Sequence, residues 1–93
     1  MPYERISYSS RKISSYEGRM PVSTAHSPKE VGAAIRAERK SQRLTQTELA
    51  DLCDVSLSFV SNLENGKDTA ELGKTLKVIS TLGLDVLIRK RGA

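Results

Sequence analysis

The chain has 93 residues but only one cysteine, one histidine and no tryptophan. Because Cys53 is alone, no intrachain disulfide can form. Cys53 and His26 are also too few to form a metal-binding cluster, and no glycine-rich phosphate loop accompanies them. The lone cysteine has no histidine partner elsewhere in the part predicted to fold, as a thiol nucleophile would need. We therefore expect no metal ion, no cofactor and no enzymatic activity.

Long apolar runs are also missing. No segment approaches the ~18 apolar residues of a membrane-spanning helix, and the N-terminus lacks the apolar stretch of a signal peptide. These features predict a cytoplasmic protein of one domain with no membrane contact. The formal net charge is +4 and the pI is about 9.5, a mild basic excess that suits a polyanionic partner without requiring one.

Residues 1–26 show neither a helical nor an alternating period. They contain three tyrosines and two of the three prolines, and four basic residues outnumber two acidic ones. We interpret them as a flexible basic extension. Such an extension could contact the DNA backbone or simply be solvated. Met20 is an alternative start, so residues 1–19 could be non-native.

The folded domain is predicted to occupy residues 27–83. Ser27 is an N-cap, Pro28 fits the first helical position, and Glu30 completes a capping box. The first helix is predicted to reach about residue 43, with one face formed by Val31, Ala34, Ile35 and Glu38. A last helix is predicted before Gly83, with its apolar spacing set by Leu72, Leu76, Ile79 and Leu82.

Two short helices are predicted between these longer ones. The first begins at Thr45, where Glu48 completes a capping box, and the second begins at the N-cap Ser56 and ends at Asn65-Gly66. The side chains predicted to be buried are Leu49, Ala50 and Cys53 of the first helix and Val60 and Leu63 of the second. A turn of three to four residues between such helices is typical of a helix-turn-helix. The alternative is a helical hairpin inside another kind of bundle.

The segment after Gly83 has a different pattern. Leu84, Val86 and Ile88 alternate within a short apolar run, which predicts a β-strand. A lone strand leaves backbone groups unpaired, so we predict that residues 84–93 form a dimerisation strand with a basic tail. The strand would pair with its own copy in a homodimer. The alternatives are a frayed tail or a strand laid on the helices of the same chain.

Two motifs together resemble the Xre family, the helix-turn-helix proteins of the Cro and phage-repressor type. They are Leu44-Thr45-Gln46-x-Glu48-Leu49-Ala50 and Val60-Ser61-x-Leu63-Glu64-Asn65-Gly66. The resemblance covers about residues 28 to 83 and implies an all-α repressor-like DNA-binding domain of four to five helices. It also implies a structural ion pair between Arg39 and Glu64.

The helix that begins after Ser56 would then enter the major groove of double-stranded DNA. The outward side chains are Ser56, Leu57, Ser58, Ser61 and Asn62. By resemblance, base edges are read by Ser56, Leu57, Ser58 and Asn62. Leu57 could instead be part of the core. The candidates for contacts with the DNA backbone are Arg43, Gln46, Ser61, Asn65 and Lys67.

The ending of helix, Leu-Gly break and strand over residues 75–86 resembles the HipB-type antitoxins. This resemblance implies a repressor of its own operon that binds an inverted-repeat operator as a homodimer and binds a HipA-type Ser/Thr kinase toxin. The alternatives are a stand-alone Xre-family regulator, or a protein-interaction module with a vestigial DNA face. The sequence does not indicate an operator sequence, a small-molecule effector or the identity of a toxin.

Overall fold

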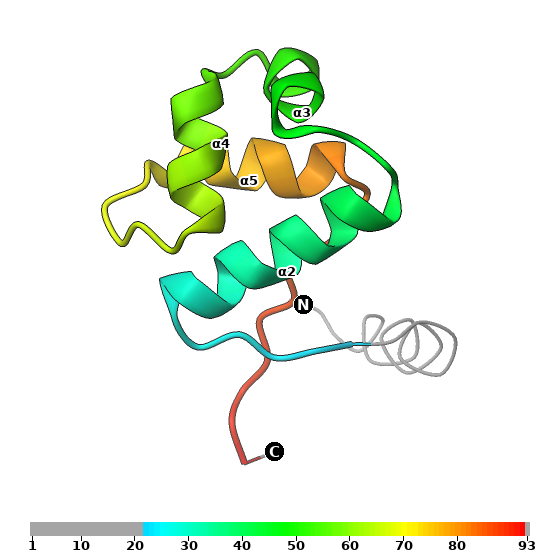
Figure 1. The fold of residues 1–93 in the computed structure, drawn as a ribbon. Coiled ribbons are helices and arrows are strands. Elements are labelled where there is room, and N and C mark those ends of the chain that lie inside the picture. Colours follow the sequence, from blue (N-terminus) through cyan, green and yellow to red (C-terminus); the bar gives the residue numbers. More distant parts are fainter. Residues whose placement is uncertain (1–21, 93) are drawn as a thin grey trace.

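The computed structural model describes residues 22–92, and all regular structure in that range is helical. The helices are α2 (Pro28–Ser41), α3 (Gln46–Cys53), α4 (Leu57–Glu64) and α5 (Leu72–Thr81) (Figure 1). The predicted all-helical domain is therefore confirmed, with four helices in the described part of the chain. Residues 1–21 of the predicted N-terminal extension lie outside the described residues, and residues 22–26 have no regular structure.

α2 begins as the sequence predicts but presents a different buried face. The Ser27 hydroxyl accepts the N–H of Glu30 at 3.1 Å, whereas the Glu30 carboxylate accepts from His26 rather than from Ser27. The buried residues are Gly32, Ile35 and Arg39, and Ala34 is exposed. The prediction for Ala34 was wrong because α2 meets α4 along the stripe of Gly32. A Cβ at Gly32 would collide with the Leu63 carbonyl oxygen and lie 2.8 Å from that of Glu64.

α2 also ends earlier than predicted, at Ser41. Arg43 has a φ of +61°, and such a left-handed residue terminates the helix. The N–H groups of Arg43 and Leu44 donate back to the carbonyls of Lys40 and Arg39. The chain therefore turns sharply into α3.

α3 and α4 start at the residues that their caps predict. Thr45 accepts the N–H of Glu48 at 3.0 Å, and the Glu48 carboxylate accepts the N–H of Thr45 at 2.8 Å. Ser56 accepts the N–H of Phe59 at 3.0 Å. Between the two helices, Asp54 takes a left-handed conformation with a φ of +57°. After α4, Gly66 has a φ of +84°, as its predicted role in ending the helix requires.

The buried face of α5 consists of Thr75, Val78 and Ile79, followed by Leu82. Leu72 and Leu76, which belong to the predicted apolar spacing, are 68% and 44% exposed. The burial of Thr75 leaves no unsatisfied hydroxyl, because the hydroxyl donates to the Glu71 carbonyl at 2.8 Å. The two leucines therefore lie outside the core.

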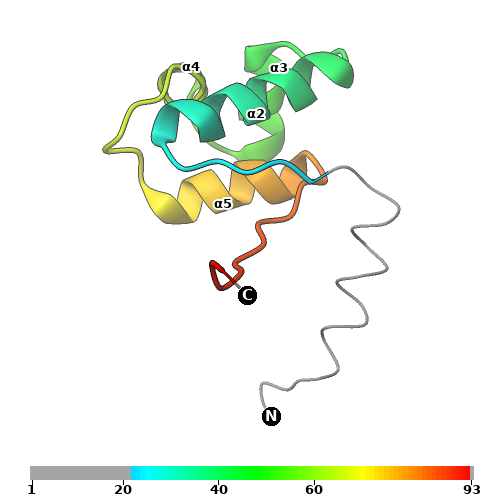
Figure 2. The same cartoon turned by 90° about the horizontal axis from the view of Figure 1, so that it is seen from below.

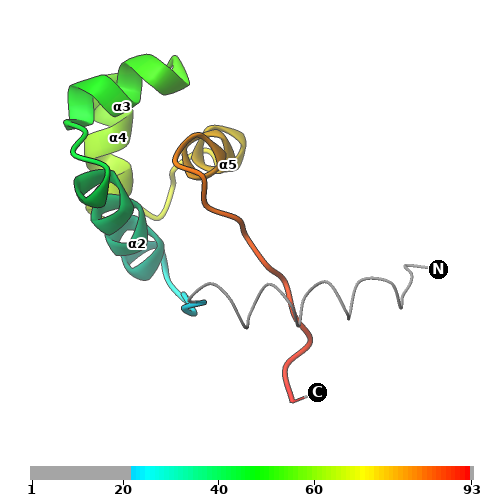
Figure 3. The ribbon, with the colours of Figure 1, turned by 90° about the vertical axis from the view of Figure 1, so that its right-hand side faces the viewer.

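The core lies where the four helices meet. Its buried apolar side chains are Ile35, Leu49, Ala50, Cys53, Val60, Leu63, Val78, Ile79 and Leu82. Figure 3 shows α2 and α4 on one side of the molecule and α5 on the other, with α3 above them. In residues 22–92 no helix is long and apolar enough to span a lipid bilayer.

The predicted C-terminal strand is not formed within this single chain. Residues 84–90 have no regular secondary structure, and they lead away from the helices (Figures 2 and 3). Leu84 still packs against the core, whereas Val86 and Ile88 are 54% and 97% exposed. A strand requires a pairing partner for its backbone groups, and residues 22–92 contain no strand that could serve as one.

Candidate nucleic-acid interface

The exposed side of α4 is its polar side. Val60 and Leu63 are buried, so the helix is fixed with the opposite face toward solvent. The exposed residues on that side and at the cap are Ser56, Leu57, Ser58 and Asn62. All four predicted base readers therefore lie at the surface. Leu57 is 48% exposed and lies outside the core cluster, so the alternative that it fills the core is excluded.

Four of the predicted backbone-contact residues lie before α3, on α4 or just after it. Arg43 is exposed just before α3, and Asn65 and Lys67 are exposed just after α4. Ser61 is half-buried on α4. Three of these four side chains are therefore at the surface.

Gln46 has a contact that the sequence analysis did not anticipate. Its amide nitrogen donates to Glu64 Oε1 at 3.0 Å, and the residue is half-buried. An amide nitrogen has two donor hydrogens, so this bond leaves one hydrogen for another acceptor. Gln46 therefore joins the start of α3 to the end of α4.

Arg39 and Glu64 form a buried bidentate ion pair. Arg39 Nε lies 2.7 Å from Glu64 Oε2, and Nη2 donates to Oε1 at 3.0 Å. The two side chains are only 9% and 1% exposed. The remaining nitrogen, Nη1, donates to the Leu44 carbonyl at 2.7 Å. The pair thus holds α2, α4 and the turn before α3 together.

The environment of Glu64 favours its charged form. Burial acts to raise its pKa, but the hydrogen bonds from Arg39 and Gln46, with the charges of Arg39 and Arg36, outweigh burial and lower the pKa. The hydrogen bond to Glu64 in turn raises the pKa of Arg39, against the opposing effect of burial. The carboxylate is therefore ionised over the neutral range.

Two further contacts position these helices and were missed from the sequence. Gln42 donates to the Leu82 carbonyl at 2.7 Å, which joins the end of α2 to the end of α5. Lys74 lies 5.8 Å from the centroid of the Phe59 ring, which places a cation against α4 from α5. Neither pair could be found from sequence spacing, because the partners are 40 and 15 residues apart.

Residues 22–92 hold no group of three or more His, Cys, Asp or Glu side chains that could bind a metal ion. Cys53 is buried in the core. Two capped helices at a tight turn, the second with an exposed polar face, define the class of helix-turn-helix proteins.

Comparison with known proteins agrees with this class. The helix-turn-helix family matches residues 35–87, and the chain belongs to this family. It is 46% identical over 65 residues to the uncharacterized HTH-type transcriptional regulator y4mF of Sinorhizobium fredii, covering 70% of this chain and 86% of y4mF. It is also 34% identical to the immunity repressor protein of Bacillus phage phi105, over 60% of this chain and 39% of the repressor.

Among solved structures, the fold is similar to HipB in the HipA-HipB-O2-O3 complex. The TM-score is 0.70 and the sequence identity 26%, with 75% of this chain and 99% of the HipB chain covered.

Proposed function

We propose that this protein is a sequence-specific DNA-binding repressor that acts as a homodimer on an inverted-repeat operator. The observation that carries the proposal is the exposed polar face of α4. This face is presented by a helix that the Arg39–Glu64 pair fixes to α2. Such a rigid, exposed helix can enter the major groove of double-stranded DNA without rearrangement.

In this proposal, base edges are read by Ser56, Leu57, Ser58 and Asn62. Asn62 can form a bidentate pair with adenine, and Leu57 can contact a thymine methyl group. The DNA backbone is contacted by Arg43, Gln46, Ser61, Asn65 and Lys67. Gln46 suits a phosphate because it lies at the N-terminus of α3, where the helix dipole favours an anion.

We assign DNA binding and dimerisation to different segments of the chain. Residues 27–83 bind DNA, and residues 84–93 dimerise through Leu84, Val86 and Ile88 with a basic tail beyond them. Residues 1–26 are an extension whose role is a separate question. A two-fold dimer presents two α4 helices, so its target is an inverted repeat with half-sites roughly 10 bp apart, or a multiple of that distance.

Within this class, we favour the antitoxin of a HipA/HipB-type operon. The support is the likeness to HipB in its complex with HipA and the extended segment after α5. The partner would then be a HipA-type Ser/Thr kinase. A stand-alone regulator is the second candidate, supported by the likeness to y4mF and to the phage repressor. Co-purification with the product of an adjacent kinase-like gene separates these two candidates.

The central test measures binding of the purified protein to its own promoter fragment and to a scrambled duplex, at several salt concentrations. We expect specific binding that weakens steeply as salt rises, because phosphate contacts release counterions. A folded, dimeric protein that binds neither duplex at low salt contradicts the proposal. That result would favour the protein-interaction module instead.

A further inference from the structure

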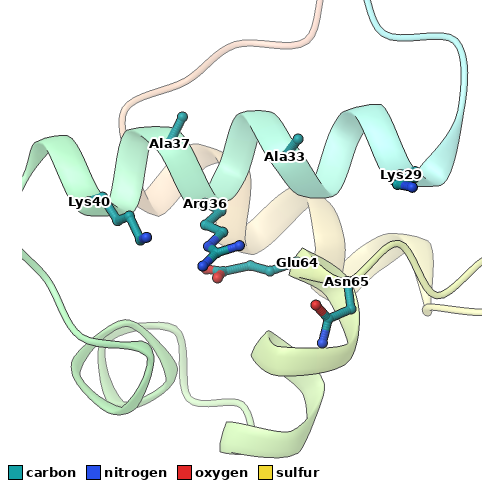
Figure 4. Close-up of a pocket in the computed structure, with 7 residues that line it drawn as sticks. All are labelled: Lys29, Ala33, Arg36, Ala37, Lys40, Glu64 and Asn65. Atoms are coloured by element: carbon teal, nitrogen blue, oxygen red, sulfur yellow. The ribbon is translucent and has the colours of Figure 1, made fainter.

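α2 carries a charged groove on the side that faces the C-terminal end of α4 (Figure 4). The groove has a volume of about 490 Å³ and is lined by Lys29, Ala33, Arg36, Ala37, Lys40, Glu64 and Asn65. The two alanines leave space between the cations. None of the residues Lys29, Arg36 or Lys40 belongs to the predicted DNA-contacting set.

The lining of this groove has three cations and one carboxylate, which is an excess of positive charge. The only carboxylate in the lining is Glu64, which Arg39 already pairs. Within residues 22–92, Lys29, Arg36 and Lys40 take part in no side-chain hydrogen bond or ion pair. Arg36 acts on Glu64 only through its charge.

The acidic residues of α2 make their contacts elsewhere. Glu30 accepts a hydrogen bond from the backbone of His26, and Glu38 accepts one from Gln42, whose amide also reaches Leu82 at the end of α5. The helix is thus divided into a cationic side at the groove and an acidic side away from it. Such a division favours an extended anion along the groove.

The groove is continuous with the proposed DNA-binding face. Asn65 belongs to both, and the turn after α4 lies directly against the start of α2. A Cβ at Gly66 would be 2.8 Å from the Lys29 Cα. At a rise of 1.5 Å per residue, the eleven steps from Lys29 to Lys40 span about 16 Å. The groove is therefore long enough to follow several phosphates of one strand.

We infer that this groove binds the sugar-phosphate backbone beside the base pairs read by α4, with Lys29, Arg36 and Lys40 neutralising its phosphates. The inference rests on the proposed DNA binding and extends it to the first helix of the domain. In a helix-turn-helix the second helix lies in the major groove while the first, here α3, crosses the backbone. The groove on α2 adjoins the C-terminal end of α4, so an α4 helix in the major groove would bring α2 to the flanking backbone. Contacts of this kind strengthen binding and fix orientation without reading sequence.

The test compares the wild-type protein with charge-removing variants on operator DNA across a salt series. The groove variant is Lys29→Gln/Arg36→Gln/Lys40→Gln. A matched pair of single variants accompanies it: Lys40→Gln removes one charge from the groove, and the control Lys77→Gln removes one charge from an exposed position of α5. Glutamine is a good helix former, and circular dichroism checks that all the variants fold.

We expect the groove variant to lose affinity on the order of tenfold or more at 0.15 M salt, because counterion release is lost. Its plot of log K against log salt becomes shallower by about 0.9 for each phosphate contact removed. Its base preference is unchanged, and the control variant stays close to wild type. Phosphate-ethylation interference on the wild-type complex identifies the contacted phosphates independently, and these should include positions outside the bases read by α4.

Two results overturn the inference while leaving the proposed function intact. In one, the wild-type protein binds its operator, and the groove variant binds it with the same affinity and the same salt slope. The other is an equal loss of affinity for Lys40→Gln and its control Lys77→Gln.

A poly-glutamate peptide that binds the wild type but not the groove variant, with DNA binding unaffected, would assign the groove to an acidic polypeptide. Failure of the wild type itself to bind DNA contradicts the proposed function instead. If the groove variant does not fold, Lys29→Gln/Lys40→Gln replaces it under the same criteria.

Discussion

At the scale of single residues, Asn62 and Lys67 show how two kinds of contact can share one surface. Both are exposed, one on α4 and the other just after it. Asn62 carries a donor and an acceptor side by side, which can match the edge of an adenine. Lys67 carries a point charge, which can match any phosphate. The proposed functions of the two residues therefore differ in their dependence on sequence.

Asn62→Ala should relax the preference at one base pair in each half-site, with a loss of roughly 1–3 kcal/mol of discrimination there. Lys67→Ala should weaken binding to all sequences alike and reduce the salt slope by about 0.9 for each contact removed. Selection of binding sites from a random pool, followed by salt titration, measures both effects. An unchanged base preference for Asn62→Ala would refute its proposed role.

Glu64 is the residue whose ionisation matters most for stability. Its pKa is held below its ordinary value of 4.5, with the bonds from Arg39 and Gln46 overcoming burial. The unfolded chain then binds a proton more readily than the folded one, so stability rises with pH through this range. The contribution is complete above pH 4.5 and is lost as pH falls through the pKa of the folded state.

Glu64→Gln should therefore make the free energy of unfolding less dependent on pH below 4.5. At neutral pH the variant should be destabilised, because Arg39 is left buried beside a neutral amide. Urea unfolding at a series of pH values measures both effects. Asp68→Asn, which changes an exposed carboxylate in the turn after α4, is the matched control and should keep the wild-type pH dependence. Identical curves for Glu64→Gln and the wild type below pH 4.5 would contradict the proposed linkage.

At the scale of elements, the starts of the helices were predictable because their causes are local. Thr45 and Ser56 lie within three residues of the N–H groups that they accept. The buried faces were less predictable. Counting apolar residues on α5 included Leu76 and omitted Thr75, whose burial depends on its bond to the Glu71 carbonyl. Likewise, nothing near Ala34 indicates that α2 packs along Gly32 instead, because that choice depends on α4.

In the candidate site, too, features with local causes could be predicted from the sequence, and contacts between distant residues could not. The surface position of Asn62 follows from the burial of Val60 and Leu63, which helical spacing predicts. The bond between Gln46 and Glu64 joins residues 18 positions apart, so no local pattern reports it. The Arg39–Glu64 pair could be anticipated only from the resemblance to a known family, because its partners are 25 residues apart.

The cap at Ser56 should be important to α4, since a helix of eight residues is marginal without help from its surroundings. Ser56→Ala removes the acceptor for the Phe59 N–H and should lower the free energy of unfolding by about 1 kcal/mol. Ser58→Ala, two residues along the same turn, removes a hydroxyl that caps nothing and should change stability by less than about 0.5 kcal/mol. Chemical denaturation compares the two variants, and equal losses would argue against the cap.

At the scale of the whole molecule, the C-terminal segment leaves apolar side chains in contact with water. Val86, Leu87 and Ile88 are about half to fully exposed, and Leu72 and Leu76 on α5 are exposed as well. Exposed apolar surface of this kind is typical of an interaction site. Pairing with a second copy would satisfy the backbone groups of residues 84–90 and would bring the apolar side chains of this segment beside those of the partner strand.

We therefore expect the wild-type protein to be a dimer in solution and Ile88→Asp to be a monomer. An aspartate in the centre of the paired strands would place like charges close together across the two-fold axis. Sedimentation equilibrium measures the mass of each species. Leu52→Asp, which makes the same change at an exposed leucine of α3, is the control and should stay dimeric.

The effect of Ile88→Asp on DNA binding should follow from the loss of contact with one of the two half-sites. The monomer should bind a single half-site as the wild-type protomer does, but should lose the added affinity for the full inverted repeat, because the second contact is no longer intramolecular. A wild-type protein that is monomeric at micromolar concentration, or an Ile88→Asp variant that stays dimeric and binds the full repeat unchanged, would show that the C-terminal segment is not the dimer interface.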